Sequence, residues 1–157
     1  MPTAQLTSHE VFRLLRTEQV DAISSAAEEI SLKAGDTVFR RGDKAEDFYV
    51  LLEGQVSLRL PRADGVNLLI DEAREGAVFG SCVCLQRDTY TLSAQCSLDS
   101  RLLKIKAPIL KQLMDRDPVM GYAIQSLVSR VYFQRYIDTM QKLQAVVQSI
   151  PLDTDTV

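Results

Sequence analysis

The sequence predicts an α+β fold, a double-stranded β-roll of the jelly-roll kind with N-terminal helices and a long C-terminal dimerisation helix. Apolar residues follow a helical period before Ile30 and again after Lys106, whereas the period between these positions is two. Glycine and aspartate turns interrupt the middle stretch at short intervals, as they do in rolls and sandwiches. We therefore expect a single domain over residues 1–157, with helices in 1–30, the roll in 31–106, helices in 107–150 and a tail in 151–157.

Two helical segments are expected before the roll. Thr7 and Glu10 have the spacing of a capping box, and apolar residues follow them at helical intervals. The second segment has four apolar residues on one side: Val20, Ile23, Ala27 and Ile30. Neither segment contains a catalytic grouping, so we expect both to pack against the roll.

The strands of the roll are expected where apolar and polar residues alternate. Residues 55–60 have the clearest alternation, and Asp64-Gly65 between two apolar runs predicts a hairpin turn. Residues 48–52 and 68–70 are apolar throughout, which predicts that both are central, deeply buried strands. Residues 100–106 complete the set.

Two helices are expected after the roll. The first ends near Asp117, because the residue before a proline disfavours helical backbone, and Pro118 suits the first turn of the next helix. That helix runs to about Ile150 and has two apolar stripes. The first stripe should cover the roll: Met120, Ile124, Leu127, Val128 and Val131. The second has coiled-coil spacing and predicts a homodimer interface: Phe133, Tyr136, Met140, Leu143, Val147 and Ile150.

Composition restricts the classes of partner. The 18 Lys and Arg against 21 Asp and Glu give a net charge of −3, so DNA binding by this chain alone is not expected. No apolar run is long enough to span a membrane and no targeting segment is apparent, which together predict a cytoplasmic protein. The single histidine and the lack of paired catalytic groups predict that the chain is not an enzyme.

One interruption in the strand pattern predicts a binding site. Three apolar residues end at Phe79 and are followed by Gly80, a compact turn of helix over 81–85, and renewed alternation from Tyr90. The backbone N–H groups that open such a turn lack internal partners and can hold an anion.

The glycine framework gives the chain a family resemblance. AGDTVFRRGDKAEDFYVLLEGQVSL, residues 34–58, contains two Gly-Asp turns, a Phe-Tyr pair and a Glu-Gly turn, and DGVNLLIDEAREGAVFG, residues 64–80, continues in register. In these features the chain resembles the cyclic nucleotide-binding domain of catabolite activator protein, Fnr-type regulators and the regulatory subunits of cyclic-AMP-dependent kinase. The resemblance covers about residues 6–150. It implies a β-roll that binds a cyclic nucleotide, cAMP or cGMP, as effector, and it implies no certain cofactor.

The resemblance also implies where the ligand lies. In the family, the phosphate-binding cassette carries a Glu directly after the glycine and an Arg further along, whereas here Ser81 follows Gly80, the Pro-Arg pair is missing, and Arg87 lies near the expected place. The residues implied as ligand-binding come from the cassette, 79–90, and from the long helix: Phe79, Gly80, Ser81, Cys82, Val83, Arg87, Asp88, Thr89, Tyr90, Arg135 and Tyr136. Tyr136 has a second interpretation, as a residue of the dimer interface.

The cysteines and the histidine have alternative interpretations. Cys82, Cys84 and Cys96 are expected to be small buried apolar side chains, with a redox-active thiol as the alternative. A metal site is not expected, because ligand sets need more residues at recognisable spacing. His9 is expected at the surface of the first helix, although some members of the family that the chain resembles bind haem through histidine.

Two functional hypotheses follow. The first is a regulatory ligand-sensing domain that binds a small anionic effector, a cyclic nucleotide or something similar, and signals through its dimerising helix to a downstream protein. The alternative is a dimerisation and protein-interaction module that has lost the ligand. A transcription factor is a third hypothesis, disfavoured because the family's helix-turn-helix follows the long helix, where this sequence has only a short tail.

Overall fold

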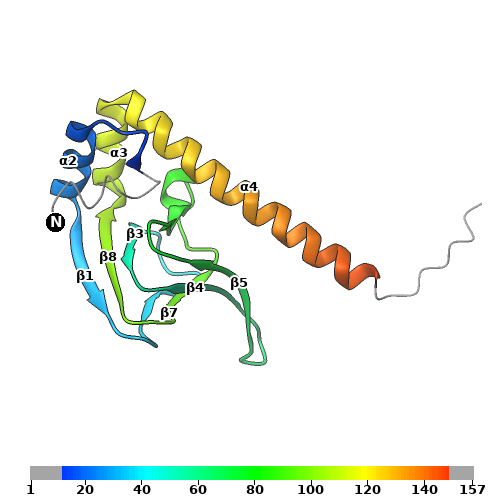
Figure 1. Cartoon of the computed structure of the whole chain (residues 1–157). Helices are drawn as coiled ribbons and strands as arrows, with labels where there is room; N and C mark the ends of the chain where they lie inside the picture. Colours follow the sequence, from blue (N-terminus) through cyan, green and yellow to red (C-terminus); the bar gives the residue numbers. More distant parts are fainter. Residues whose placement is uncertain (1–11, 149–157) are drawn as a thin grey trace, which may run out of the picture.

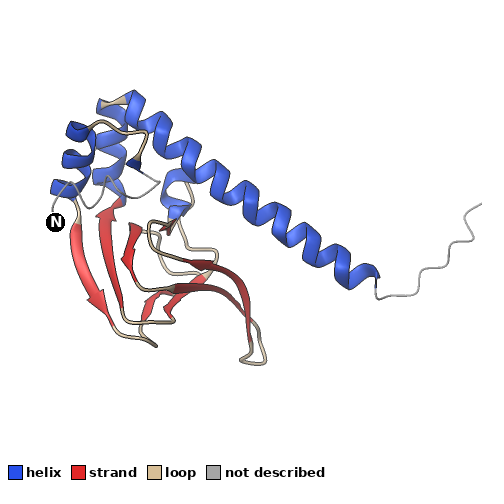
Figure 2. Cartoon of the chain, in the orientation of Figure 1, coloured by secondary structure: helices blue, strands red, loops and turns tan. Residues whose placement is uncertain are grey.

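The computed structural model describes residues 12–148, and their eight strands form two antiparallel sheets (Figures 1 and 2). One sheet has the order β1-β8-β3-β6 and the other the order β2-β7-β4-β5. The strands are β1 (Glu28–Leu32), β2 (Thr37–Phe39), β3 (Asp47–Glu53), β4 (Val56–Pro61), β5 (Asn67–Ala73), β6 (Val78–Phe79), β7 (Ser93–Cys96) and β8 (Ser100–Lys106). The predicted β-roll is confirmed.

β3 and β8 are buried on both faces, and this explains their apolar sequences. Val50 and Leu103 belong to the core beneath the helices, whereas Leu51 and Leu102 belong to the core between the two sheets. Each of these four side chains is at most 2% exposed. The prediction that 48–52 forms a central, buried strand is therefore confirmed.

The same prediction for residues 68–70 is wrong. They lie in β5, which pairs only with β4 and forms an edge of its sheet. Leu68 and Leu69 are 45% and 53% exposed, near the tip of a hairpin that projects from the roll (Figure 1). Asp64-Gly65 does form the predicted turn of this hairpin, where the Arg62 amide donates to the Val66 carbonyl. The apolar run thus lies at an edge, where among residues 12–148 no further strand pairs with β5.

Three helices pack on the outer face of the β1-β8-β3-β6 sheet: α2 (Thr17–Ala26), α3 (Ala107–Arg116) and the start of α4 (Pro118–Gln148). The sequence predicts that the second helix reaches Ile30, but α2 ends at Ala26 and Ile30 lies in β1. The first apolar stripe of α4 covers the roll as predicted, with Met120, Ile124 and Val128 buried in the core that the helices share with the sheet.

Asp117 caps the start of α4 and connects it to α2. One of its carboxylate oxygens accepts a hydrogen bond from the Met120 amide at 3.2 Å, and the other accepts one from the buried Gln19 side chain at 2.7 Å. The first contact caps α4 in the manner of an N-cap aspartate, and the second ties that cap to α2. α4 is therefore anchored at its start and extends past the roll at its other end (Figure 1).

The second apolar stripe of α4 lies on the surface. Phe133, Tyr136, Met140, Leu143 and Val147 are 63%, 57%, 49%, 57% and 38% exposed, and Ile150 lies outside the described residues. The capping box at Thr7 and Glu10, His9 and the tail 151–157 also lie outside them. Among residues 12–148, no helix combines the length and apolar character needed to cross a membrane.

Candidate ligand-binding site

The segment after β6 folds into a tight turn and a short 3-10 helix. Gly80 has a φ of 67°, and a β-carbon at this position would lie 3.0 Å from the Tyr49 ring and 3.1 Å from the Asp47 carbonyl oxygen. Only glycine meets both conditions, because it tolerates positive φ and has no side chain to clash. The chain then enters η2 (Ser81–Leu85), so the predicted helical turn is present.

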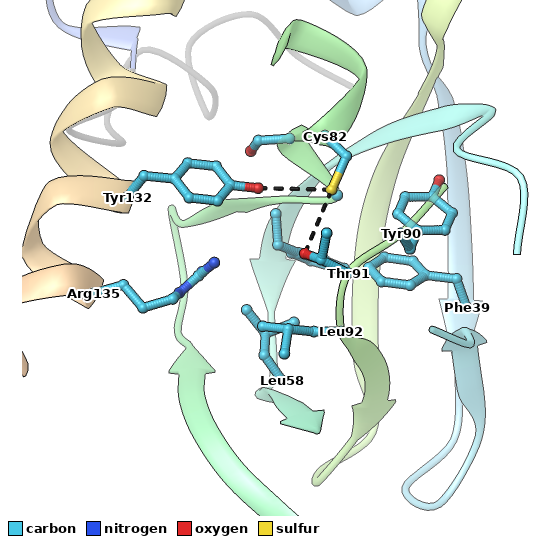
Figure 3. Close-up of a pocket in the computed structure, with 11 residues that line it drawn as sticks. Phe39, Leu58, Cys82, Tyr90, Thr91, Leu92, Tyr132 and Arg135 are labelled. Carbon is cyan, nitrogen blue, oxygen red and sulfur yellow. Dashed lines mark hydrogen bonds between the residues drawn. The ribbon is translucent and has the colours of Figure 1, made fainter. Parts of the chain in front are cut away.

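A small cavity lies between η2, the segment 90–92 that precedes β7, and α4 (Figure 3). Its volume is about 20 Å³, enough for one water molecule. The roll supplies Phe39, Leu58, Phe79, Gly80, Ser81, Cys82, Tyr90, Thr91 and Leu92, and α4 supplies Tyr132 and Arg135. The cavity therefore joins the two parts of the molecule that the sequence predicts to share a ligand.

The structure brings some of the predicted site residues together here and places others elsewhere. Phe79, Gly80, Ser81, Cys82, Tyr90 and Arg135 line the cavity. Val83 packs against the core beneath the helices, and Tyr136 lies on the exposed stripe of α4. Arg87, Asp88 and Thr89 are exposed, in a loop whose backbone pairs with residues 43–45.

Arg135 supplies the positive charge of the cavity. Its Nε lies 3.3 Å from Oδ2 of Asp71 on β5, and its guanidinium lies 5.1 Å from the centre of the Tyr132 ring. The Arg135 side chain is only 15% exposed, so this charge is largely removed from water. Among the described residues that line the cavity, Arg135 is the only basic one and none is acidic.

Comparison with known proteins assigns the family. The family model for the cyclic nucleotide-binding domain matches residues 29–117, more than half of the chain. The chain belongs to the cyclic nucleotide-binding domain family. The predicted resemblance is confirmed.

Several relatives show how this domain is used elsewhere. The chain is 24% identical over 139 residues to the cAMP-dependent protein kinase regulatory subunit of Dictyostelium discoideum, covering 88% of this chain and 42% of that protein. Some relatives are enzymes, such as the lysophospholipase nte1 of Aspergillus terreus. The two are 25% identical over 90% of this chain, which corresponds to 9% of that enzyme. The chain thus spans less than half the length of these curated relatives.

Solved structures agree on the fold. The catabolite activator protein of Thermus thermophilus superposes with a TM-score of 0.73 at 24% identity, over 86% of this chain and 62% of that one. The sensor domain of the transcriptional regulator DNR from Pseudomonas aeruginosa superposes with a TM-score of 0.72 at 21% identity, over 99% of this chain and 95% of that one. At these identities the likeness establishes the fold alone.

Ser81 stands directly after the cassette glycine of this cyclic nucleotide-binding domain. The residue is 3% exposed, and its hydroxyl oxygen has no hydrogen-bond partner among residues 12–148. A buried polar group without a partner costs about 1–3 kcal/mol. A polar atom of a ligand in the adjoining cavity would relieve this cost.

The thiol of Cys82 connects the cassette to α4. Its sulfur lies 3.7 Å from the Tyr132 hydroxyl and 3.8 Å from the Thr91 hydroxyl (Figure 3). Burial and the neighbouring Cys82 raise the pKa of Tyr132 to about 12, so its hydroxyl is neutral at physiological pH. Burial likewise raises the pKa of Cys84 to about 12, which favours the interpretation of Cys84 as an apolar side chain over a reactive thiol.

A second polar contact joins η2 to α4, because the Gln125 side chain donates to the Cys84 carbonyl at 2.7 Å. The described cysteines are all free, and no cluster of potential metal ligands occurs among residues 12–148. Whether the thiols respond to oxidation stays a prediction.

Sequence reasoning missed five residues that line the cavity: Phe39, Leu58, Thr91, Leu92 and Tyr132. Tyr132 had a usable signal, because it lies three positions before Arg135 and residues at this spacing share one helix face. The roll residues gave no such signal, since only the three-dimensional pairing of strands distant in sequence brings them together.

Proposed function

We propose that this cyclic nucleotide-binding domain is a regulatory sensor that binds a small anionic effector between η2 and α4 and reports its presence through a pair of α4 helices. One observation carries the proposal: Arg135 extends from α4 to the same cavity that the unpartnered hydroxyl of Ser81 lines from the cassette. An anion placed there would touch the roll and the helix at once. Cyclic nucleotides are the effectors that the family suggests.

Arg135 gives the effector a means of acting on α4. At present its guanidinium pairs with Asp71 on β5, and a bound carboxylate or phosphate would compete for the same donors. Any effector larger than water must also widen the gap that Cys82 and Tyr132 close. Binding would thus exchange one set of contacts between α4 and the roll for another, and so shift the equilibrium between two helix positions.

The readout is proposed to be a homodimer. The exposed stripe from Phe133 to Val147 has the alternating three- and four-residue spacing of a helix-pair interface. A second copy of α4 would cover it. We also propose a cytoplasmic location and a downstream protein partner. The proposal includes no DNA binding by this chain alone and no enzymatic activity.

The test is a thermal-shift titration of the purified chain with cyclic AMP, cyclic GMP and cyclic di-GMP. An effector at 100 times its dissociation constant adds about 2.7 kcal/mol to the free energy of unfolding, or roughly 5 to 10 °C for a domain of this size. Arg135→Gln should abolish the shift, and Arg87→Gln is the matched control that removes an exposed arginine of the cassette loop. A shift that survives Arg135→Gln would refute the proposed site, and its loss in Arg87→Gln alone would assign the anion to the cassette arginine.

A second candidate is an interaction module without an effector. The narrow cavity and the exposed apolar tip of the β4–β5 hairpin favour it. It predicts no thermal shift with any small anion, together with capture of a partner protein that is lost when Leu68 and Leu69 are replaced by serine.

A further inference from the structure

We infer that the effector of this domain is a small apolar monocarboxylate, such as an aromatic acid, and not a nucleotide. This inference rests on the proposed function and specifies its ligand. It begins from the chemistry of the wall around the cavity, which combines one buried cation with aromatic and aliphatic side chains.

The wall is suited to an anion with an apolar body. Phe39, Phe79, Leu58 and Leu92 offer apolar surface, and Arg135 offers a planar guanidinium that can donate two parallel hydrogen bonds to a carboxylate. Figure 3 shows Arg135 and Tyr132 extending from α4 towards the cassette, with Leu58 and Leu92 on the opposite side. An aromatic acid would therefore place its charge on Arg135 and its ring against the apolar wall.

Hydroxyl groups at the wall can complete the binding of a carboxylate. Ser81 is 3% exposed, and its hydroxyl has no partner within the described structure. Tyr132 keeps its proton and can donate as well. Two neutral donors beside one guanidinium match the acceptor-only character of a carboxylate.

The same wall is poorly suited to a nucleotide. A ribose hydroxyl needs an acceptor, and no carboxylate lies among the described residues of this wall. Ser81 and Thr91 offer only neutral hydroxyls, so the several donors and acceptors of a sugar and a base would be only partly satisfied. Sites that bury unpaired polar groups bind such ligands weakly.

The cavity itself is small, but it borders a larger groove. About 20 Å³ is open between η2 and α4, whereas sites for drug-sized ligands commonly enclose 300–1,000 Å³. Arg135 and Leu58 also line a groove of about 730 Å³ that runs along α4 beside β5. If Arg135 leaves Asp71, the cavity and the groove can join and make room for one ring beside Leu58. The groove also brings carboxylates, Asp71 and Glu72 among them, so the selection against a nucleotide rests on the wall of the small cavity and not on its size.

Isothermal titration of the full chain with benzoate, phenylacetate and indole-3-acetate tests the inference. We expect at least one acid to bind, its neutral amide to bind at least tenfold more weakly, and Arg135→Gln to weaken the acid at least tenfold. Ser81→Glu places a second carboxylate beside the ligand and should also weaken the acid at least tenfold. Arg87→Gln, outside the cavity, should leave the affinity unchanged.

Cyclic AMP and cyclic GMP are titrated in parallel so that two kinds of failure can be separated. Nucleotide binding that depends on Arg135, with no binding of the acids, would overturn this inference and leave the proposed sensor intact. Silence from acids and nucleotides alike would overturn both. Equal affinity for an acid and its amide would show that the charge of Arg135 does not select the ligand, which would also refute the inference.

Discussion

Replacing Met140 and Leu143 together with glutamine should dissociate the proposed dimer. Complete burial of one such side chain is worth about 1.5–3 kcal/mol, and these two are still 49% and 57% exposed. Covering the remaining half is therefore worth about 0.8–1.5 kcal/mol each. A symmetric pair of helices contains four of these side chains, so the double variant should lose about 3–6 kcal/mol, or two to four orders of magnitude in dimer affinity.

Sedimentation velocity over a wide range of concentrations measures this loss directly. Glutamine is a good helix former, so circular dichroism should show an unchanged helix content and exclude unfolding as the cause. Tyr122→Gln is the matched control, because Tyr122 is an exposed apolar residue of α4 that lies outside the stripe. A parent chain that stays monomeric at high concentration, or a double variant that dimerises like the parent, would refute the reasoning.

Other predictions concern the site and the roll. Asp71→Asn removes the carboxylate that competes with the effector for Arg135, so it should tighten effector binding several-fold in a titration. Glu72→Gln on the same strand should leave binding unchanged, and weaker binding in Asp71→Asn would contradict the proposed exchange of partners at Arg135. Gly54→Ala should cost roughly 1–3 kcal/mol or more in chemical denaturation, because φ is +97° and the new β-carbon would meet Ser100 and Asp99; Gly65→Ala, with similar φ but open space, should cost less. The melting temperature should fall as pH rises from 10 towards 12. Folding raises the pKa of Tyr132 to about 12, so its neutral hydroxyl contributes fully to stability only below the pKa of an unfolded tyrosine, about 10, and Tyr132→Phe should remove part of this pH dependence.

The sequence predicted the roll well because several local signals agree. The turn at Asp64-Gly65, the break at Pro118 and the apolar stripe from Met120 to Val131 each follow from rules that act over a few residues. The depth of a strand does not follow from such rules. Residues 48–52 and 68–70 have the same apolar pattern, yet β3 lies between two strands and β5 lies at an edge. Their difference is set by neighbours distant in sequence.

The site divides in the same way. Gly80 could be predicted because positive φ has a residue preference, whereas Arg135 was implied by the family resemblance, which places part of the ligand site on the long helix. Leu58 and Phe39 could not be found, since they reach the cavity only through the pairing of strands in the folded roll. Arg87 was proposed from its sequence position near the expected arginine, but the loop that carries it leaves the side chain exposed.

The proposed ligand contact and the proposed partner contact meet in one turn of α4. Tyr132 and Arg135 line the cavity, while their sequence neighbours Phe133 and Tyr136 lie on the exposed stripe with their rings 6.2 Å apart. Successive residues of an α-helix are rotated by about 100°, so a rotation or shift that moves Arg135 moves Tyr136 with it. A sensor built this way needs no chain of intervening residues between effector and dimer. It also assigns different tasks to adjacent residues, because a Tyr136 ring that packs against a second copy of α4 is not free to contact the effector in its own cavity.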